Sequence, residues 1–185
     1  MSDTEYRRIC LVGVRGVGKS TLIRSVIDSL PKYEYIIGSA VLRELAGPDF
    51  AHFDHLPPDT KQRYREDAID WMITRQKLVN RHILCDGHTS LLDESTGKVG
   101  PVFTNMDCNF FRELILLEAS AQTIFERRSK DSSKQRSLDT SIIAAELSGE
   151  RNTGREIADQ WGMRLHILPD GKTSNVRKSL LEVLS

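Results

Sequence analysis

The sequence predicts an α/β fold, a three-layer sandwich in which helices flank a five-stranded parallel sheet. Five short apolar runs occur along the chain, and none alternates cleanly between apolar and polar residues. Continuous runs of this length are typical of parallel strands that are covered on both faces. Helical patterns lie between the runs, and strands that alternate with helices build a doubly wound sheet. The predicted strands are Ile9–Val12, Tyr35–Ile37, Ile83–Cys85, Leu114–Leu117 and Leu165–Leu168.

The helices are predicted from apolar spacing and from residues that favour helix ends. Residues 22–30 place five apolar side chains on one helical face. Pro57-Pro58-Asp59 predicts the start of the next helix, with Asp59 as its N-cap. Ser120 and Asp139 predict the N-caps of two later helices, of which the second ends at Gly162. Apolar residues from Val176 to Leu184 predict a terminal helix.

Two segments do not follow the alternation of strands and helices. Thr89–Phe110 contains glycines, a proline and polar residues, and we expect a long irregular loop there, which in a compact domain is often functional. Arg127–Arg136 is basic and rich in serine, and we expect it to join two helices. We interpret residues 1–185 as one domain in which residues 39–81 and 127–138 form two distinct segments.

Composition excludes several classes of protein. The 26 Lys and Arg residues balance 26 Asp and Glu residues, so the chain lacks the basic excess of a general nucleic-acid binder. Hydrophobic residues make up 39% of the chain, which is enough for a packed core. No apolar run approaches the roughly 20 residues that span a bilayer, and the polar N-terminus differs from a secretory signal. We therefore expect a cytoplasmic protein with no membrane partner.

The chain has three cysteines and no CxxC pair. Cys10 and Cys85 sit inside apolar runs, and Cys108 completes an odd count. An odd number of cysteines in such places is typical of reduced, buried thiols. We therefore expect neither a disulfide framework nor a metal role for them.

The strongest motif follows the first predicted strand and precedes a helical pattern. It matches G-x-x-x-x-G-K-[ST] in full, and this strand–loop–helix context is the one the motif requires. Glycines let the backbone curl so that successive N–H groups converge on phosphate oxygens, and the helix adds its positive N-terminal dipole. We expect ATP to bind here, with a lysine on the terminal phosphates and a serine hydroxyl on Mg²⁺. The motif residues are Gly13, Val14, Arg15, Gly16, Val17, Gly18, Lys19, Ser20 and Thr21.

A second polar signal lies at the end of the third predicted strand. Asp86 ends this strand, and an acidic residue in that place commonly holds the Mg²⁺ shell in P-loop proteins. His88 follows at the carboxyl end of the sheet, where ligands of open α/β sheets bind. We therefore predict Ser20 and Asp86 as the metal-binding pair.

The remaining motifs narrow the kind of P-loop protein. The chain has no N-K-x-D sequence, with which GTPases read guanine. A ring-forming AAA+ ATPase should be longer, with a helical lid domain after the core. Kinases of small molecules or nucleotides remain. In these, Arg127, Arg128 and Arg136 could close over bound phosphates, neutralise the transferred group and exclude water.

The chemistry of the acceptor stays open at this point. A hydroxyl acceptor benefits from a nearby carboxylate base, a role that Asp86 could fill. A phosphate acceptor is already an anion and instead needs cations, for which Arg43 after the second strand is a candidate.

Several segments, in order along the chain, resemble the archaeal-type adenylate kinases, which belong to the wider nucleoside monophosphate kinase group. The resemblance implies a P-loop NTPase fold and transfer of phosphate from ATP to a nucleoside monophosphate with Mg²⁺. Ser39 departs from the acidic residue usual in the family, and the arginine that many monophosphate kinases carry after the third strand is missing. The segments that carry the resemblance are Gly13–Thr21, Tyr35–Ser39, Ile83–Thr89, Thr96–Pro101 and Arg127–Arg136.

The resemblance also implies roles for individual residues. Arg128 and Arg136 would be lid arginines and, with Lys19 and Asp86, the catalytic set. Gly171 and Lys172, within Asp170–Thr173, would flank the donor adenine. Ser39, Arg43 and His88 would face the acceptor.

We therefore expect an ATP-dependent kinase similar to adenylate kinase, with nucleotides as its substrates. Its single P-loop kinase-like domain, residues 1–185, would carry a lid segment at 127–138 and an acceptor-side insertion at 39–81. Two alternatives remain. One is an ATP-binding switch or accessory ATPase that acts with a protein partner, and the other is a kinase of a small hydroxyl-bearing metabolite. An oligomer or a protein partner is compatible with each of these hypotheses.

Overall fold

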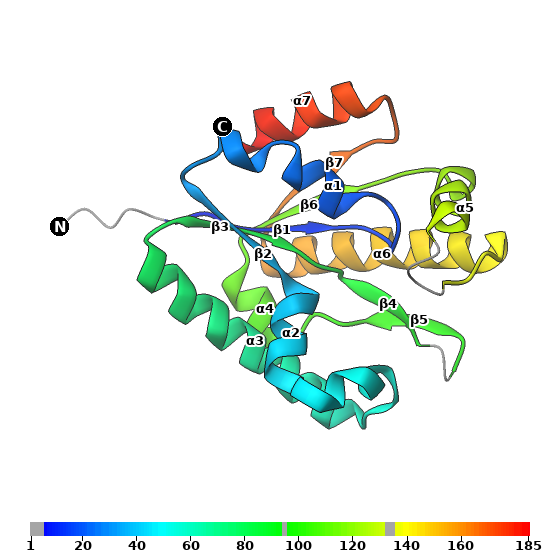
Figure 1. Cartoon of the computed structure of the whole chain (residues 1–185), viewed down its shortest axis with the longest axis horizontal. Coiled ribbons are helices and arrows are strands. Elements are labelled where there is room, and N and C mark those ends of the chain that lie inside the picture. Colours follow the sequence, from blue (N-terminus) through cyan, green and yellow to red (C-terminus); the bar gives the residue numbers. More distant parts are fainter. Residues whose placement is uncertain (1–5, 94–95, 132–135) are drawn as a thin grey trace.

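The computed structural model describes residues 6–93, 96–131 and 136–185, and its centre is a five-stranded sheet (Figure 1). All strands of this sheet run parallel, in the order β2-β3-β1-β6-β7. The predicted fold class and all five predicted strands are therefore confirmed. The strands are β1 (Arg8–Val12), β2 (Tyr33–Ile37), β3 (His82–Asp86), β6 (Glu113–Leu117) and β7 (Arg164–Leu168).

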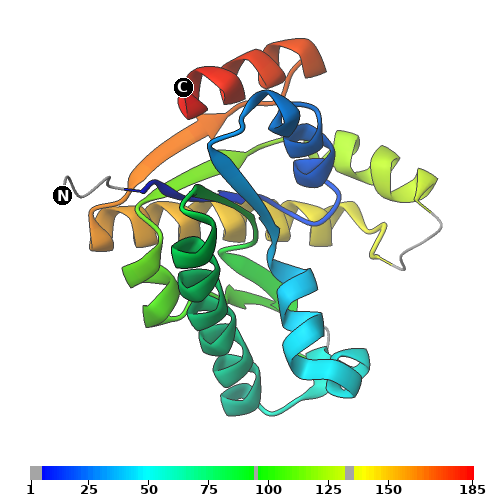
Figure 2. The same cartoon turned by 60° about the vertical axis from the view of Figure 1, so that its left-hand side comes forward.

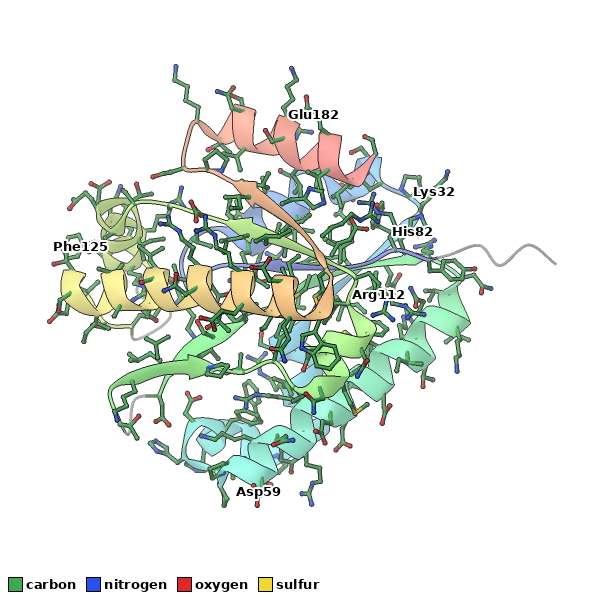
Figure 3. The ribbon with its side chains drawn as sticks, turned by 180° about the vertical axis from the view of Figure 1, so that it is seen from behind. Lys32, Asp59, His82, Arg112, Phe125 and Glu182 are labelled. Atoms are coloured by element: carbon green, nitrogen blue, oxygen red, sulfur yellow. The ribbon has the colours of Figure 1, made fainter. Side chains whose placement is uncertain are left out.

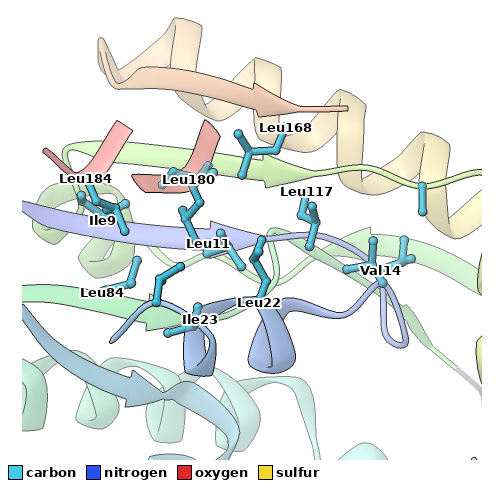
Figure 4. Packing of buried hydrophobic residues seen from close by; sticks show 14 of the residues in the cluster. Ile9, Leu11, Val14, Leu22, Ile23, Leu84, Leu117, Leu168, Leu180 and Leu184 are labelled. Atoms are coloured by element: carbon cyan, nitrogen blue, oxygen red, sulfur yellow. The ribbon is translucent and has the colours of Figure 1, made fainter. Parts of the chain in front are cut away.

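The central strands are apolar on both faces because both faces are covered. Ile9 and Leu11 of β1 pack into one hydrophobic cluster, whereas Cys10 and Val12 pack into a second cluster on the opposite face. Figure 4 shows the first cluster, in which Leu22 and Ile23 of α1 (Lys19–Arg24) lie against β1. Since side chains alternate between the two faces of a strand, burial on both sides requires a continuous apolar run.

The helices are divided between the two faces of the sheet. On the first face lie α1, the 3₁₀ helix η1 (Ile27–Ser29) and α7 (Thr173–Leu184). On the second lie α3 (Pro58–Val79), α4 (Asn105–Phe110) and α6 (Thr140–Trp161). The helix expected over residues 22–30 is shorter than predicted, because α1 ends at Arg24 and the chain continues as η1.

The connection between β2 and β3 forms an arm beside the sheet. It comprises α2 (Gly38–Ala46), the 3₁₀ segment η2 (Gly47–His55) and α3, and Figure 2 shows it extending from the body of the molecule. The prediction of Asp59 as N-cap is wrong, because α3 already begins at Pro58 and Pro57 occupies the cap position. Proline is well suited to the first turn, where its missing N–H is not needed. Figure 3 places Asp59 at the outer end of α3.

The long irregular loop expected at Thr89–Phe110 is also wrong. The chain instead forms an antiparallel pair, β4 (Ser90–Asp93) and β5 (Lys98–Pro101), in which Leu91 faces Gly100, and continues into α4. Thr104 and Asp107 form a capping box at the start of α4. The elements are short and rich in turn residues, so their periodicity was too weak to distinguish them from a loop.

The predicted ends of the later helices are confirmed. Ser120 caps α5 (Ala121–Lys130), Asp139 caps α6, and Gly162 ends α6 in the left-handed conformation. Because α5 extends to Lys130, Arg127 and Arg128 lie on a helix rather than on a connecting loop. Residues 132–135 of the predicted lid segment 127–138 lie outside the described residues.

The three cysteines are free and buried, as predicted. Within the three described ranges, no helix combines the length and the apolar character that crossing a membrane requires.

The hairpin packs so closely on α6 that it leaves no room for a side chain at Gly149. A Cβ there would overlap Val99 Cγ1, and the β-branched valine is stiff. We therefore predict that Gly149→Ala lowers the free energy of unfolding by about 1–3 kcal/mol through overpacking, although alanine is the better helix former. Urea unfolding measures this.

Gly154 on the same helix is the matched control. A Cβ at Gly154 would meet Thr89 only at 3.8 Å, an ordinary contact, so Gly154→Ala should raise stability by about 0.5–1 kcal/mol. Adding Val99→Ala to Gly149→Ala should recover part of the loss. Equal effects of the two glycine substitutions would contradict this packing.

Candidate active site

Most of the residues predicted to carry the chemistry line one cleft at the carboxyl ends of the parallel strands. The cleft has a volume of about 1280 Å³ and extends from the Gly16–Thr21 loop, past Asp86 and His88, to the arm formed by α2, η2 and α3. Ligands of open α/β sheets bind at this edge, where the strand order reverses beside β1. A smaller cavity of about 670 Å³ lies at the β7 edge, where Arg7 and Arg164 already pair with the buried Glu113.

The loop between β1 and α1 has the curled backbone that the motif predicts. Gly13, Gly16 and Gly18 have φ values of 150°, 91° and 103°, in the region that favours glycine. A Cβ at Gly13 would lie 2.6 Å from the carbonyl oxygen of Leu117. This loop therefore requires glycine for its conformation and for the close approach of β6, and its N–H groups can converge on an anion.

Lys19 contacts the backbone of the same loop. Its ammonium group is buried and donates a 2.6 Å hydrogen bond to the carbonyl oxygen of Gly13. Burial lowers the pKa of Lys19, while the carboxylates of Asp86 and Glu150 act in the opposite direction. Phosphate oxygens would replace the carbonyl as partners of this cation.

Ser20 and Asp86 form a pair of oxygen ligands suited to Mg²⁺. The Ser20 hydroxyl donates a 2.5 Å hydrogen bond to Asp86 Oδ2, and Lys19 Nζ lies 3.9 Å from Asp86 Oδ1. Mg²⁺ prefers one or two protein oxygens together with phosphate oxygens and water. The two residues fit that role, whereas among the described residues no group of three or more His, Cys, Asp or Glu side chains could hold a metal.

His88 lies between the phosphate-binding loop and the acceptor side of the cleft. Its Nε2 is 3.5 Å from Lys19 Nζ and its Nδ1 is 3.9 Å from Glu150 Oε1. Burial, and then the positive charges of Lys19 and Arg15, hold the pKa of His88 well below its usual range. The ring is therefore neutral near pH 7, with a buried Nδ1 that has no hydrogen-bond partner among the described residues.

The three arginines of the predicted lid have different surroundings. Arg128 is buried, donates hydrogen bonds to the carbonyl oxygen of Arg15 and pairs with Glu146 at 2.8 Å. It therefore supports the phosphate-binding loop from behind. Arg136 lies at the cleft, paired with Asp131 at 3.3 Å and near Gly16. Arg127 also lines the cleft and donates a hydrogen bond to the carbonyl oxygen of Val17.

The part of the cleft predicted for the acceptor brings together two guanidinium groups and two aromatic rings. Arg43 lies over the ring of Phe50 at 4.9 Å, and Arg65 lies over that of Phe53 at 6.0 Å. Within the described ranges neither arginine forms an ion pair, and burial lowers the pKa of Arg65. Ser39 lines the same part of the cleft. These cations are available to a negatively charged acceptor.

Sequence reasoning missed Arg65. The signal was present in the spacing of α3, because Arg65 precedes Ala68 and Ile69 by three and four residues and so shares their buried face. A cation on the apolar face of a predicted helix is unusual.

The predicted adenine-flanking residues are only partly at the cleft. Gly171 lines it together with Asp170 and Thr173, whereas Lys172 is exposed, precedes α7 and is not among the lining residues. The carboxylate of Asp170 accepts a 2.8 Å hydrogen bond from the N–H of Ser120, which ties this turn to the start of α5.

Glu150 was also missed. It lies on α6, is 1% exposed and binds the N–H groups of Gly13 and of Thr89. Its position in the sequence, among polar residues of a helix, carries no signal of this burial, because the contacts come from segments far away in the chain.

Comparison with known proteins identifies the family. A family model described as an AAA domain matches residues 12–142, so the chain belongs to this AAA domain family. No curated protein sequence matches the chain.

Two solved structures show how far the fold is shared. The shikimate kinase from Acinetobacter baumannii in complex with shikimate matches with a TM-score of 0.66 and 15% identity, over 97% of this chain and 93% of that chain. The shikimate kinase from Bacteroides thetaiotaomicron matches with a TM-score of 0.59 and 13% identity, over 96% of this chain and 98% of that chain. The fold is therefore that of a P-loop kinase, and the archaeal adenylate kinase type stays a prediction.

The neutral His88 predicts how stability depends on pH. The unfolded chain binds a proton at the ordinary histidine pKa of about 6.5, whereas folded His88 does so only at lower pH, so stability is lost as the pH falls below about 6.5. Between pH 7.5 and 5.5 the wild-type chain should lose about 1 kcal/mol more free energy of unfolding than the His88→Asn variant. Urea unfolding at both pH values measures this, and equal losses would contradict the assignment of a neutral ring.

Proposed function

We propose that this protein transfers the γ-phosphoryl group of ATP to a small anionic acceptor. One observation carries the proposal. The loop with Lys19 and Ser20 opens into the same cleft as the cations Arg43 and Arg65, with Asp86 at the junction. A site for the phosphates of the donor thus meets a site for a second anion, as group transfer requires.

The residues of this chain would act mainly by binding and by neutralising charge. The N–H groups of Gly16–Thr21 and the ammonium of Lys19 would bind the donor phosphates, and Arg136 would add positive charge from the lid side. Ser20 and Asp86 would hold Mg²⁺, which supplies further charge neutralisation when bound. The arm of α2, η2 and α3 would cover the acceptor and exclude water, which otherwise competes for the phosphoryl group.

The first candidate acceptor is a small hydroxyl-bearing metabolite with an anionic group. The likeness to shikimate kinases, one of them in complex with shikimate, supports this class over nucleoside monophosphates. Arg43 and Arg65 would bind the anionic group, and Asp86, whose Oδ1 lies 3.9 Å from Lys19 Nζ, could receive the proton of the hydroxyl.

The second candidate acceptor is a nucleoside monophosphate. Phe50 and Phe53 beside the two arginines suit a flat base next to a phosphate. Asp86 already accepts a hydrogen bond from Ser20, and the lowered pKa of His88 makes it a weak base. A phosphate oxygen is already an anionic nucleophile and needs no base to remove a proton. The weak bases at this site therefore favour a nucleoside monophosphate as the acceptor.

A panel of acceptors distinguishes the two classes. The protein is incubated with Mg²⁺, ATP and one acceptor at a time, either nucleoside monophosphates or hydroxy acids, and the phosphorylated products are identified by mass spectrometry. A phosphorylated acceptor supports the proposal and names the class. ATP hydrolysis without transfer to any acceptor, accelerated by a protein partner, would instead support the switch or accessory ATPase.

Loss of the charge at Lys19 should abolish most of the turnover. Lys19→Ala removes the buried cation at the donor phosphates, and the loss of one such stabilising group costs roughly 3–4 kcal/mol in the transition state. We expect kcat/KM to fall by about two to three orders of magnitude while the thermal transition stays cooperative. Full activity of this variant would contradict the donor site.

Loss of either acceptor-side cation should weaken binding of the acceptor and leave binding of ATP unchanged. We predict that Arg43→Ala and Arg65→Ala each raise the KM of the acceptor about tenfold or more, because a charge-assisted contact contributes roughly 1.5–3 kcal/mol. The KM of ATP should stay within about twofold. Arg63→Ala is the matched control, since Arg63 is an exposed arginine of the same helix. An unchanged acceptor KM in both variants would place the acceptor elsewhere.

A further inference from the structure

A buried carboxylate on α6 accepts hydrogen bonds from two segments that lead into the cleft. Glu150 Oε1 accepts hydrogen bonds from the N–H of Gly13 at 2.9 Å and from that of Thr89 at 3.0 Å. Glu150 Oε2 accepts from the N–H and the hydroxyl of Ser90, at 2.7 Å and 3.0 Å. A carboxylate that is 1% exposed and receives four hydrogen bonds is well satisfied without a cation.

The four donors belong to two segments that are far apart in the sequence. One segment borders the proposed donor site, and the other leads to the proposed acceptor side. Gly13 begins the phosphate-binding loop, directly after β1. Thr89 and Ser90 follow His88 and lead into the β4–β5 hairpin, whose Leu91 lines the acceptor side. Glu150 therefore fixes the start of the donor loop relative to the turn that carries His88.

A second glutamate of α6 acts on the same loop through an arginine. Glu146, one helical turn before Glu150, pairs with Arg128, and Arg128 donates to the carbonyl oxygen of Arg15 at 2.9 Å. Glu150 thus binds the first amide of the loop directly, whereas Glu146 acts on the carbonyl of Arg15 only through Arg128 of α5. Neither contact uses the N–H groups that face the cleft.

We propose that Glu150 is a positioning residue, which aligns the donor phosphates with the acceptor by joining the first amide of the phosphate-binding loop to the His88 turn. The inference rests on the proposed phosphotransferase function. Glu150 does not reach the reacting atoms, because its side chain is behind the loop. Its effect should fall on turnover rather than on nucleotide affinity, since misplacement by about 1 Å can cost about a hundredfold in rate.

The test compares Glu150→Gln with Glu156→Gln, an exposed glutamate of the same helix. Glutamine offers one acceptor oxygen and turns an NH₂ group toward N–H donors, so some of the hydrogen bonds that Glu150 accepts are lost. We expect the kcat of Glu150→Gln to fall about 10- to 100-fold, with the affinity for MgADP, measured by calorimetry, within about threefold. Glu156→Gln should match the wild type in both.

Hydrogen exchange gives a readout that needs no acceptor. In the wild type, MgADP should slow amide exchange at Thr89 and Ser90 as well as in the loop, because Glu150 links them. In Glu150→Gln the slowing should be confined to Gly16–Thr21. This measurement stays informative when no acceptor in the panel is phosphorylated. Failure of the proposed reaction is therefore distinguishable from failure of the positioning role.

A milder variant covers the case in which Glu150→Gln does not fold. Ser90→Ala removes only the hydroxyl bond to Glu150 and should lower kcat about two- to fivefold, with unchanged affinity for MgADP. The proposal is overturned when Glu150→Gln, or Ser90→Ala where the former does not fold, equals the Glu156→Gln control in kcat and in the exchange response at Thr89. A parallel loss of MgADP affinity and kcat would also overturn it, since that marks a merely structural role.

Discussion

The curled backbone between β1 and α1 determines where the other elements of the site must lie. Its glycines adopt backbone angles that other residues rarely adopt, and Gly13 approaches the Leu117 carbonyl too closely for any side chain. The interior of the protein holds this backbone from behind, through Glu150 and through Arg128 with Glu146. The N–H groups on the cleft side thereby stay available to an anion.

The surrounding fold follows from placing that loop at the edge of a buried sheet. Strand β1 is central and apolar on both faces, so the loop emerges where β3 and β6 also end. Asp86 reaches Ser20 because β3 is the neighbour of β1, with Leu11 and Asp86 in register. The β2–β3 connection contributes the arm with Arg43 and Arg65. The carboxyl ends of three adjacent strands thus bring together the residues proposed for the donor site, for Mg²⁺ and for the acceptor.

Patterns local in the sequence were sufficient to predict part of this arrangement. Apolar runs predicted the five strands, and the phosphate-binding motif with Asp86 predicted the pair now seen at 2.5 Å. The β4–β5 hairpin was predicted as a loop, because four-residue strands with turn residues have little periodicity. Arg128 was predicted as a lid arginine, whereas its burial and its ion pair with Glu146 of the next helix could not be predicted from the sequence. Glu150 was missed for the same reason: its partners are 60 or more residues away.

Binding of nucleotide phosphates by the Gly13–Thr21 loop is the property on which the proposed function depends. Titration of ¹⁵N-labelled protein with MgADP, followed by amide NMR, tests it most directly. We expect large chemical-shift changes for the amides of Gly16–Thr21, and small or no changes for the amides of strand β7 at the edge of the sheet. Unchanged loop amides at millimolar MgADP would show that the loop does not bind the nucleotide.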